Sequence, residues 1–216
     1  QAGESAIIRL ATMARQNQHI PYGEHDAHVW KLQRNAVDPA QMLRGGQVIC
    51  GRNNTRMALN VAMKRAAGFE TAYPVGRGEK IICLKNRNDI GVINGMFLEL
   101  EDVREEDKYA LSAVVRTEDG VTVGGNGAKP ARQYIYKGHF DDHIAHDRER
   151  ERRDHYIKKG LIEAVWAYAI TCHKSQGSSF PTVVVYDDGL SRTAEERARW
   201  LYTAITRAEW GLVILA

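Results

Sequence analysis

The sequence has no apolar run long enough to cross a bilayer. Its longest apolar runs, such as residues 166–170 and 183–186, are far shorter than the about 20 residues that a transmembrane helix needs. Cysteine is scarce: Cys50, Cys83 and Cys172 form no CxxC pair, which argues against a disulfide framework or a zinc ribbon. No secretory signal opens the chain. We therefore expect no membrane partner and a location in the reducing cytoplasm.

No strong excess of charge of one sign marks the sequence. Among its 216 residues, 30 Lys and Arg stand against 27 Asp and Glu, which gives a formal net charge of +3. This mildly basic balance permits a nucleic-acid partner without requiring one. The chain begins Gln-Ala-Gly without an initiator methionine, so we expect it to be an excised part of a longer protein.

Both ends of the chain alternate between strand and helix patterns. Near the amino end, helix patterns cover residues 7–14 and 56–67, and a strand pattern covers residues 47–50. Near the carboxyl end we expect strands at 166–172, 182–186 and 212–215 and a helix over 194–206. Strands that alternate with helices predict a parallel sheet.

The middle of the chain has short strand patterns separated by glycine and asparagine turns. We expect strands at 80–84, 96–103, 109–116 and 132–136. Asn-Gly and Asp-Gly turns favour hairpins, so these strands predict a small antiparallel barrel. A highly charged helix pattern follows over 141–159, which favours a solvated linker over a DNA-backbone contact. The simplest organisation is a discontinuous α/β domain, residues 1–73 plus 164–216, interrupted by a barrel domain at 74–163.

The densest group of polar residues follows the strand expected at 166–172. It consists of Thr171, His173, Lys174, Ser175, Gln176, Gly177 and Ser178. Hydroxyl, ammonium and backbone N–H groups suit phosphate oxygens, and Gly177 permits a close backbone approach. Because ligands bind at the carboxyl edge of a parallel sheet, we expect this loop to lie at that edge. The residue types alone leave two interpretations open, a phosphate-contacting loop and an ordinary capped turn.

A second feature is the amphipathic helix pattern over residues 194–206, which is followed by Arg207. An arginine near a helix C-terminus is common because its charge interacts favourably with the helix dipole. Taken alone, this pattern favours a structural arginine over a functional one.

Taken together, the two features resemble motifs V and VI of superfamily 1 DNA helicases. The stretches that carry the resemblance are AYAITCHKSQGSSFPTVVVY and, further along, RWLYTAITRAEWGLVIL. They are most similar to the RecD-like and Dda-like branch, which moves 5′ to 3′. Three other stretches resemble the segment after motif IV, motif IVa and the start of an inserted SH3-like barrel: QAGESAIIRLATMAR, QVICGRNNTRMALN and EKIICLKNRNDIGVINGMFLEL. The resemblance is weakest from 104 to 163.

The resemblance implies a fold and a set of partners. The fold is a second RecA-like domain, of the P-loop NTPase type but lacking the P-loop, interrupted by a small SH3-like antiparallel β barrel. The implied partners are single-stranded DNA and the P-loop-bearing N-terminal RecA-like domain of the same polypeptide. ATP with Mg²⁺ would bind only together with that N-terminal domain. The resemblance also implies an intracellular protein of bacterial or phage type.

The resemblance further implies roles for individual residues. Arg207 matches the motif VI arginine, an arginine finger that reaches the γ-phosphate across the cleft between two RecA-like domains. Gln176 and Gly177 match the part of motif V that senses the nucleotide. The residues matched to nucleic-acid contacts are Thr171, His173, Lys174 and Ser178 in motif V and Asn53, Thr55 and Arg56 in motif IVa. Asn60 matches a frequent asparagine of motif IVa, for which a structural role suffices.

Two departures from the family pattern bear on function. Where many members have Gly-Ser-Glu-Phe, this chain has Ser179 in place of the glutamate, which weakens the contact that the carboxylate makes to the nucleotide sugar or neighbouring loops. The chain also contains no Gly-x-x-x-x-Gly-Lys-Ser/Thr motif and no Asp-Glu motif II after a strand. ATP then has no cradle, so we expect the carboxyl-terminal half of a helicase, inactive as an ATPase alone. The alternative is a non-catalytic, helicase-derived module that binds nucleic acid or docks a partner.

Two aspartate–histidine pairs in the charged segment have the spacing of metal ligands. They are Asp142 with His146 and His143 with Asp147. Metal sites usually have three or four protein ligands, and no third ligand is evident in the sequence. We therefore expect no bound metal ion and keep a metal-dependent nuclease as a minor alternative.

Two further sets of residues allow a nucleic-acid interpretation and a plainer one. Side chains around the first barrel strand suit either a DNA contact or a simple basic turn: Lys80, Lys85, Arg87 and Asn88. Tryptophans can serve as base-stacking platforms, but we expect packing roles for Trp30, Trp166 and Trp210.

Overall fold

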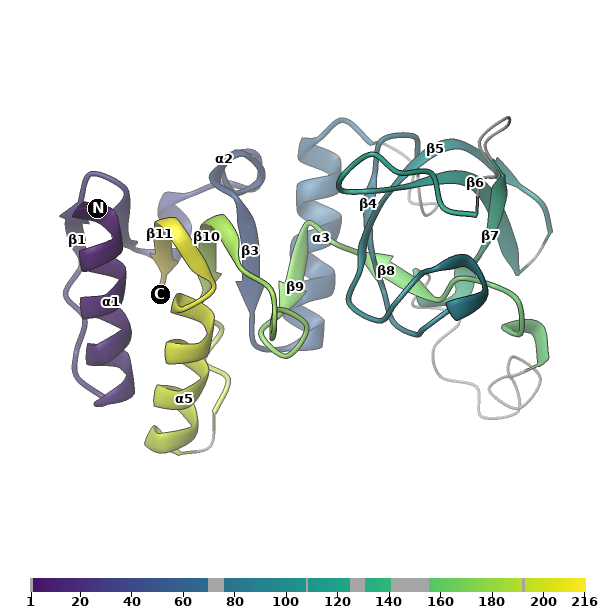
Figure 1. The fold of residues 1–216 in the computed structure, drawn as a ribbon. Coiled ribbons are helices and arrows are strands. Elements are labelled where there is room, and N and C mark those ends of the chain that lie inside the picture. The colour runs from purple at the N-terminus through teal and green to yellow at the C-terminus, as the bar shows by residue number, and fades with distance from the viewer. Residues whose placement is uncertain (1, 70–75, 108, 125–130, 141–155, 192) are drawn as a thin grey trace. The chain divides into compact units, whose positions relative to one another are not determined.

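The structure, a computed structural model, describes residues 2–69, 76–107, 109–124, 131–140, 156–191 and 193–216. The chain forms two compact units, which are shown in Figure 1. The α/β unit comprises residues 1–69 and 168–216, and the barrel unit comprises residues 70–167. Among the described helices, none combines the length and the apolar composition that a membrane crossing needs.

The α/β unit contains a six-stranded sheet with the order β1-β2-β11-β10-β3-β9. Its strands are β1 (Gly23–Asp26), β2 (Val29–Leu32), β3 (Gln47–Cys50), β9 (Ala169–Thr171), β10 (Phe180–Tyr186) and β11 (Ala208–Leu215). β1 and β2 form an antiparallel hairpin, and all other neighbouring strands pair in parallel. The consecutive valines of β10 are buried, as expected for a central strand that is covered on both faces.

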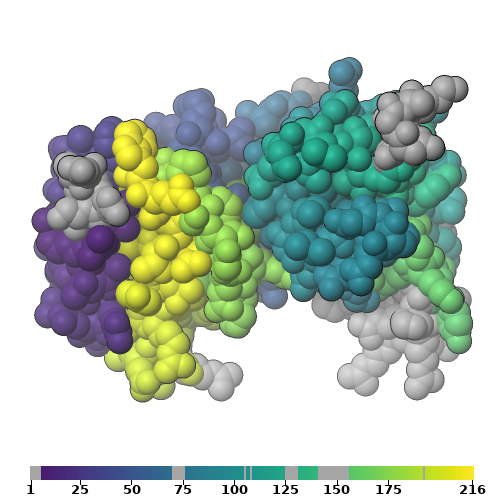
Figure 2. Space-filling view, in the orientation of Figure 1, coloured from purple at the N-terminus to yellow at the C-terminus, as the bar shows by residue number. Residues whose placement is uncertain are grey.

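Helices cover both faces of this sheet: α1 (Ala2–Arg15), α2 (Pro39–Gly45), α3 (Asn53–Ala66) and α5 (Ala194–Ile205), with a short 3₁₀ helix, η1 (Arg34–Ala36). Met42 of α2 and Met63 of α3 pack in one core cluster with Val48 and Cys50 of β3. Successive side chains of a strand point to opposite faces, so Ile49 points away from that cluster. On this other side α1 and α5 lie side by side, as Figures 1 and 2 show.

Two of these helices begin at side-chain caps, and a third does not. Asp38 and Gln41 form a capping box at the start of α2, with hydrogen bonds of 2.7 and 2.8 Å. The Thr193 hydroxyl accepts a hydrogen bond from the backbone N–H of Glu196 at 3.1 Å and caps α5. Arg52, at the start of α3, provides no side-chain cap.

The barrel unit contains a five-stranded antiparallel sheet with the order β7-β6-β5-β4-β8. Its strands are β4 (Lys80–Cys83), β5 (Phe97–Glu105), β6 (Ala110–Thr117), β7 (Arg132–Tyr136) and β8 (Ala164–Trp166), with 3₁₀ helices η2 (Asn88–Ile90) and η3 (Lys137–His139). Ile135 of β7 also pairs with Ile162, just before β8, and the Ile162 N–H donates to the carbonyl of Tyr134 at 2.7 Å. This pairing joins the two edges of the sheet, which closes into the ring seen in Figure 1.

The predicted α/β fold class is confirmed, with a parallel sheet in one unit and an antiparallel sheet in the other. The SH3-like assignment of the barrel stays a prediction. The single strand expected at 166–172 is wrong, because β8 pairs with β4 in the barrel whereas β9 pairs with β3 in the α/β sheet. Residues 164–167 therefore group with the barrel, whereas the sequence pattern places them with residues 168–216.

No sequence pattern predicts the hairpin of β1 and β2, because its first strand, Gly-Glu-His-Asp, is polar and is typical of a loop. Most of the charged pattern at 141–159 lies outside the described residues, which resume at residue 156. Both aspartate–histidine pairs also lie outside the described residues.

Candidate functional site

The polar loop between β9 and β10 runs from the carboxyl edge of the sheet, where the parallel strands end, to the amino edge, where they begin. β9 ends at Thr171, which is level with Cys50 at the end of β3 and with Tyr186 at the end of β10. The loop then reaches Phe180, which starts β10 beside Ala208 at the start of β11. It therefore begins at the carboxyl edge of the sheet and finishes at the amino edge. The expectation that the whole loop lies at the carboxyl edge is wrong, and the predicted site residues form two groups.

Short-range hydrogen bonds shape this loop. The backbone N–H groups of Lys174 and Ser175 donate to the carbonyl of Thr171 at 2.8 and 3.1 Å. The buried Ser175 hydroxyl donates to the carbonyl of Cys172 at 2.8 Å. Gly177 has a φ of +85°, a left-handed conformation that few other residues tolerate. A Cβ at this position would meet nothing within 4 Å, so conformation rather than close packing requires the glycine.

One group of predicted residues lies at the carboxyl edge of the adjacent strands β3 and β9. Asn53, Thr55 and Arg56 stand in the first turn of α3, directly after β3. His173 and Lys174 follow β9. Asn53 and His173 are exposed, and the other three are partly exposed. The positive end of the α3 dipole lies at the same place, which favours an anion there. We call these five residues the carboxyl-edge group.

Two residues matched to nucleic-acid contacts lie outside this group. Thr171 is only 9% exposed, and its carbonyl accepts the backbone hydrogen bonds that shape the loop. Ser178 lies at the other end of the loop, where its carbonyl accepts a hydrogen bond from Arg207. The structure therefore does not bring all of the residues matched to nucleic-acid contacts together.

The second group lies at the amino edge, where Arg207 is held against the end of the loop. Its guanidinium donates to the carbonyls of Thr203 and Ser178 at 3.2 and 3.1 Å and to the Thr206 hydroxyl at 3.2 Å. The Arg207 carbonyl accepts a hydrogen bond from the Phe180 N–H at 2.8 Å. A guanidinium has five N–H donors. Bonds to described residues use three of them, which leaves one donor on Nη1 and one on Nη2 without a partner in that part of the chain.

Gln176 and Gly177 are exposed in the half of the loop that approaches Arg207. Together with Ser178 and Arg207 they form what we call the amino-edge group. Beside this group, the Ser179 hydroxyl donates to the carboxylate of Glu209 in β11. A carboxylate therefore stands next to the position where many helicases have a motif V glutamate. Sequence reasoning missed Glu209, because its contact spans 30 residues and no local pattern signals it.

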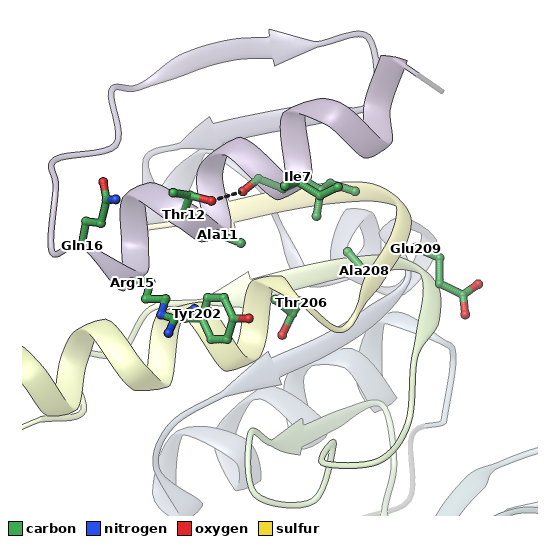
Figure 3. Close-up of a pocket in the computed structure, with 10 residues that line it drawn as sticks. Ile7, Ala11, Thr12, Arg15, Gln16, Tyr202, Thr206, Ala208 and Glu209 are labelled. Carbon is green, nitrogen blue, oxygen red and sulfur yellow. Dashed lines mark hydrogen bonds between the residues drawn. The ribbon is translucent and has the colours of Figure 1, made fainter.

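A pocket of about 690 Å³ lies between α1 and α5 (Figure 3). It is lined by Ile7, Ile8, Ala11, Thr12, Arg15, Gln16, Tyr202, Thr206, Ala208 and Glu209. Thr12 donates its hydroxyl hydrogen bond to the carbonyl of Ile8 at 2.9 Å, and the Arg15 guanidinium lies 5.8 Å from the centre of the Tyr202 ring. Thr206 and Glu209 connect the pocket to the amino-edge group. The pocket therefore borders that group without including Arg207.

Asn60 links α3 to β9 from a fully buried position. Its Nδ2 donates to the carbonyls of Arg56 and Ala169, both at 2.8 Å, and its Oδ1 accepts a hydrogen bond from the Ala169 N–H at 3.0 Å. The side chain thus pairs with both backbone groups of one residue in β9. These contacts are structural, and they hold the strand that leads into the β9–β10 loop.

The cysteines near the site are not suited to nucleophilic chemistry. Cys50, Cys83 and Cys172 are all buried, and none of the three forms a disulfide. Burial raises the pKa of the Cys50 thiol to about 12, and the pKa of Cys172 to about 11. A thiol reacts as its thiolate, which is scarce at neutral pH when the pKa is this high.

The weaker candidates of the barrel are engaged in other contacts or are exposed. Lys85 forms an ion pair of 2.7 Å with Glu163, and Arg87 forms one of 2.7 Å with Asp89. Lys80 is exposed at the start of β4. Among the described residues no group of three metal-ligating side chains occurs.

The tryptophans differ in environment. Trp166 is 7% exposed and packs on Phe140, as expected. Trp210 is 54% exposed, and the centre of its ring lies 3.8 Å from the centre of the His28 ring. Trp210 therefore departs from the expected packing role, because more than half of its surface stays open to solvent.

The residues that match a known protein family include the whole β9–β10 loop. Residues 166–215 match the family described as UvrD-like helicase C-terminal domain, a range that contains this loop, α5 and Arg207. This match confirms, over these residues, the resemblance to superfamily 1 helicases that the two motifs carry. An assignment to the RecD-like and Dda-like branch is consistent with the match. No curated protein matches the chain.

Solved structures of Pif1 helicases share the fold over nearly the whole chain. One concerns DNA unwinding at forked double-stranded DNA by two coordinating Pif1 helicases; it is 16% identical, has a TM-score of 0.50 and covers 99% of this chain and 47% of that chain. Another is Pif1 helicase from Bacteroides in complex with ADP-AlF3 and single-stranded DNA, at 15% identity and a TM-score of 0.50, covering 99% of this chain and 49% of that chain. This chain spans about half the length of these helicases.

Proposed function

We propose that this chain is the second motor domain of an ATP-dependent DNA helicase or translocase that moves 5′ to 3′. The observation that carries the proposal is the position of Arg207. It lies within the match to a helicase C-terminal domain and is fixed to the β9–β10 loop by a hydrogen bond of 3.1 Å. Two of its N–H donors bind none of the residues that the structure describes. Those donors suit the oxygens of a phosphate.

The amino-edge group supplies one side of an ATP site. The donors of Arg207 fit a γ-phosphate that is presented by a second domain, and neutralise the charge that develops on it during hydrolysis. In related NTPases an arginine in this role contributes roughly 10³ to 10⁵ in rate. The sequence contains no P-loop lysine and no motif II carboxylate, so the groups that would hold ATP and Mg²⁺ belong to the P-loop-bearing domain. Alone, this chain is then inactive as an ATPase.

The carboxyl-edge group supplies contacts to single-stranded DNA. Arg56, Lys174 and the first turn of α3 can bind phosphates, and Asn53 and His173 offer further hydrogen bonds. A Pif1 helicase of similar fold has been solved with single-stranded DNA, which supports this class of partner. Binding is then salt-dependent.

The β9–β10 loop connects the two groups. Its first residues stand at the carboxyl edge and its last residues contact Arg207, so a movement at the nucleotide is passed to the nucleic acid through one continuous loop. Such a connection is what a motor requires, because ATP binding and hydrolysis must alter the grip on the strand.

ATP hydrolysis by the protein that carries both RecA-like domains, or by this chain mixed with the P-loop-bearing half, tests the proposal. Arg207→Ala is expected to lower kcat for DNA-stimulated hydrolysis by about 10³-fold. Arg199→Ala is the matched control, because Arg199 lies on α5, the helix that leads to Arg207, with its side chain 77% exposed, and forms an ion pair only with Glu195 among the described residues. Near wild-type kcat in Arg207→Ala would show that Arg207 is not an arginine finger.

The alternative is a non-catalytic module that binds nucleic acid or docks a partner, and the absence of a P-loop motif from the sequence motivates it. Salt-dependent binding of an oligonucleotide is compatible with both functions. Hydrolysis of ATP that appears when a P-loop-bearing half is added would exclude the module and support the motor.

A further inference from the structure

The turn between β3 and α3 is held by the loop that follows β10. Asp188 Oδ2 accepts a hydrogen bond from the backbone N–H of Arg52 at 2.7 Å, and the Arg52 guanidinium donates to the carbonyl of Gly189 at 3.1 Å. Arg52 gives α3 no side-chain cap, so a distant loop supplies the acidic partner at this helix start. The approach is close: a Cβ on Gly51 would lie 2.6 Å from Asp188 Oδ1 and 2.5 Å from Leu190 Cβ.

The same loop is fixed to α5 by a buried carboxylate. Asp187 is 3% exposed and accepts hydrogen bonds from both terminal nitrogens of Arg197, with Nη1 to Oδ1 at 3.0 Å. Oδ1 also accepts a hydrogen bond from the Gly189 N–H at 3.1 Å. A two-point contact between a guanidinium and a carboxylate fixes orientation as well as distance. The anchor to α5 therefore also orients the turn that presents Asp188.

α5 connects this anchor to Arg207. Arg197 lies near the start of α5, and Arg207 follows directly after the C-cap of the helix. From Arg197 to Ile205 the helix rises about 12 Å. The helix therefore reaches from the carboxyl edge, where Asp187 follows β10, to the amino edge, where Arg207 contacts the β9–β10 loop. This gives a second connection between the two edges, and it is stiffer than a loop.

We propose that Asp188 is a positioning residue for nucleic-acid binding: through the contacts Arg197–Asp187–Asp188–Arg52, α5 holds the first turn of α3 in its binding orientation. The inference rests on the proposed function, because it assumes that the carboxyl-edge group binds single-stranded nucleic acid. It adds to that function a route from α5 to the nucleic acid that does not pass through motif V.

The charge of Asp188 agrees with a positioning role. A carboxylate beside a phosphate-binding turn repels phosphates, so direct contact with nucleic acid does not explain an acid at this place. Its Oδ1 is buried and accepts no hydrogen bond from the described residues, which leaves the hydrogen bond to Arg52 as the contact that an acid here provides. An amide of the same shape keeps that contact without the charge.

Single-stranded DNA binding by the full 216-residue chain tests the proposal, with a fluorescein-labelled oligothymidylate followed by anisotropy at several salt concentrations. Asp188→Ala is expected to weaken binding about tenfold, the order for loss of one charge-assisted hydrogen bond. Because a displaced α3 loses a phosphate contact, the slope of log K against log salt is expected to shrink by about 0.7. Asp188→Asn keeps the acceptor and is expected to stay within about twofold of the wild type.

Asp38→Ala is the matched control. Asp38 accepts a hydrogen bond of 2.7 Å at the start of α2, outside the carboxyl-edge group, so its loss is expected to lower stability but leave affinity and salt slope unchanged. Arg197→Ala is expected to weaken binding as Asp188→Ala does, and the double variant less than the sum of the two. If Asp188→Ala does not fold, Arg197→Lys tests the same route, because lysine keeps the charge without the two-point contact.

Unchanged affinity and slope in Asp188→Ala, or an equal change in Asp38→Ala, would overturn the proposal and leave the proposed function standing. Where Arg197→Lys is used instead, unchanged binding by that variant would overturn the proposal in the same way. Strict additivity of Asp188→Ala and Arg197→Ala would overturn the route to α5. Absence of salt-dependent binding by the wild-type chain would overturn this inference and the nucleic-acid part of the proposed function together.

Discussion

Replacement of Asn60 by alanine tests how β9, and with it the β9–β10 loop, is held in place. β9 is the edge strand of its sheet and pairs only with β3 among the described strands. Asn60 adds hydrogen bonds to both the N–H and the carbonyl of Ala169 on β9. The alanine side chain can make neither bond, and the fully buried position gives water little access to replace them.

The magnitude follows from the groups left without partners. A buried donor or acceptor that loses its partner costs about 1–3 kcal/mol. Two backbone groups of Ala169 lose theirs, so Asn60→Ala is expected to lower the free energy of unfolding by about 4 kcal/mol. Asn60→Asp is expected to cost at least as much, because a carboxylate would face the carbonyls of Arg56 and Ala169 instead of donating to them.

Urea unfolding followed by far-UV circular dichroism measures the change in stability, and hydrogen exchange of the Ala169 amide localises it. Asn54→Ala is the control on the same helix, because Asn54 is exposed, and it is expected to stay within about 0.5 kcal/mol of the wild type. A free energy of unfolding for Asn60→Ala within about 1 kcal/mol of the wild type would refute the reasoning, since the bonds to β9 would then contribute little.

Three further predictions concern titratable groups whose pKa burial shifts. The thiols of Cys50 and Cys172, whose pKa burial raises to about 12 and about 11, are expected to react with a disulfide reagent at pH 8 only after unfolding; rapid labelling of the native chain would contradict this. Burial lowers the pKa of His139 below 6.5, and its hydrogen bond with Glu163 only partly offsets this. As pH drops below 6.5, the unfolded state takes up this proton before the folded state does, so the free energy of unfolding is expected to fall. Urea unfolding at several pH values measures this loss, and His139→Gln is expected to remove it. Burial alone would raise the pKa of Glu163, but hydrogen bonds from Lys85 and His139 bring it below 4.5. A second loss of stability is therefore expected as pH falls below 4.5. This second loss is expected to be absent in Glu163→Gln, and its persistence in that variant would contradict the assignment to Glu163.

Local sequence patterns predict much of the α/β unit. The apolar run at 47–50 becomes β3, and the helix pattern that begins at Arg56 becomes the body of α3, because turn residues separate the two and leave little ambiguity. The helix before Arg207 is predicted equally well, since its apolar positions recur at helical spacing. These elements are long or clearly bounded, so local propensity and burial agree.

Local patterns fail where one apolar stretch serves two sheets. Residues 164–171 are almost all buried, so periodicity gives no sign that the chain leaves the barrel and enters the α/β sheet between Ala167 and Tyr168. The polar strand β1 fails for the opposite reason, because it lies at a sheet edge and carries no apolar alternation.

The geometry of the site depends on contacts between distant residues. The hydrogen bonds Arg207–Ser178 and Arg52–Asp188 span 29 and 136 residues. They arise because the order of strands in the sheet brings the loops together, and no local pattern encodes that order. Motifs therefore predict candidates for the site, whereas the split of these residues between the carboxyl edge and the amino edge emerges only from the fold.

The most direct test of the motor function compares two ligands in the protein that carries both RecA-like domains. ADP–aluminium fluoride mimics the transferring phosphoryl group, whereas ADP lacks it. If Arg207 contacts the γ-position, Arg207→Ala is expected to weaken binding of ADP–aluminium fluoride at least about 100-fold and binding of ADP by less than about twofold. Equal affinities of the wild type and Arg207→Ala for ADP–aluminium fluoride, or an equal loss for both ligands, would contradict the role of Arg207 as an arginine finger.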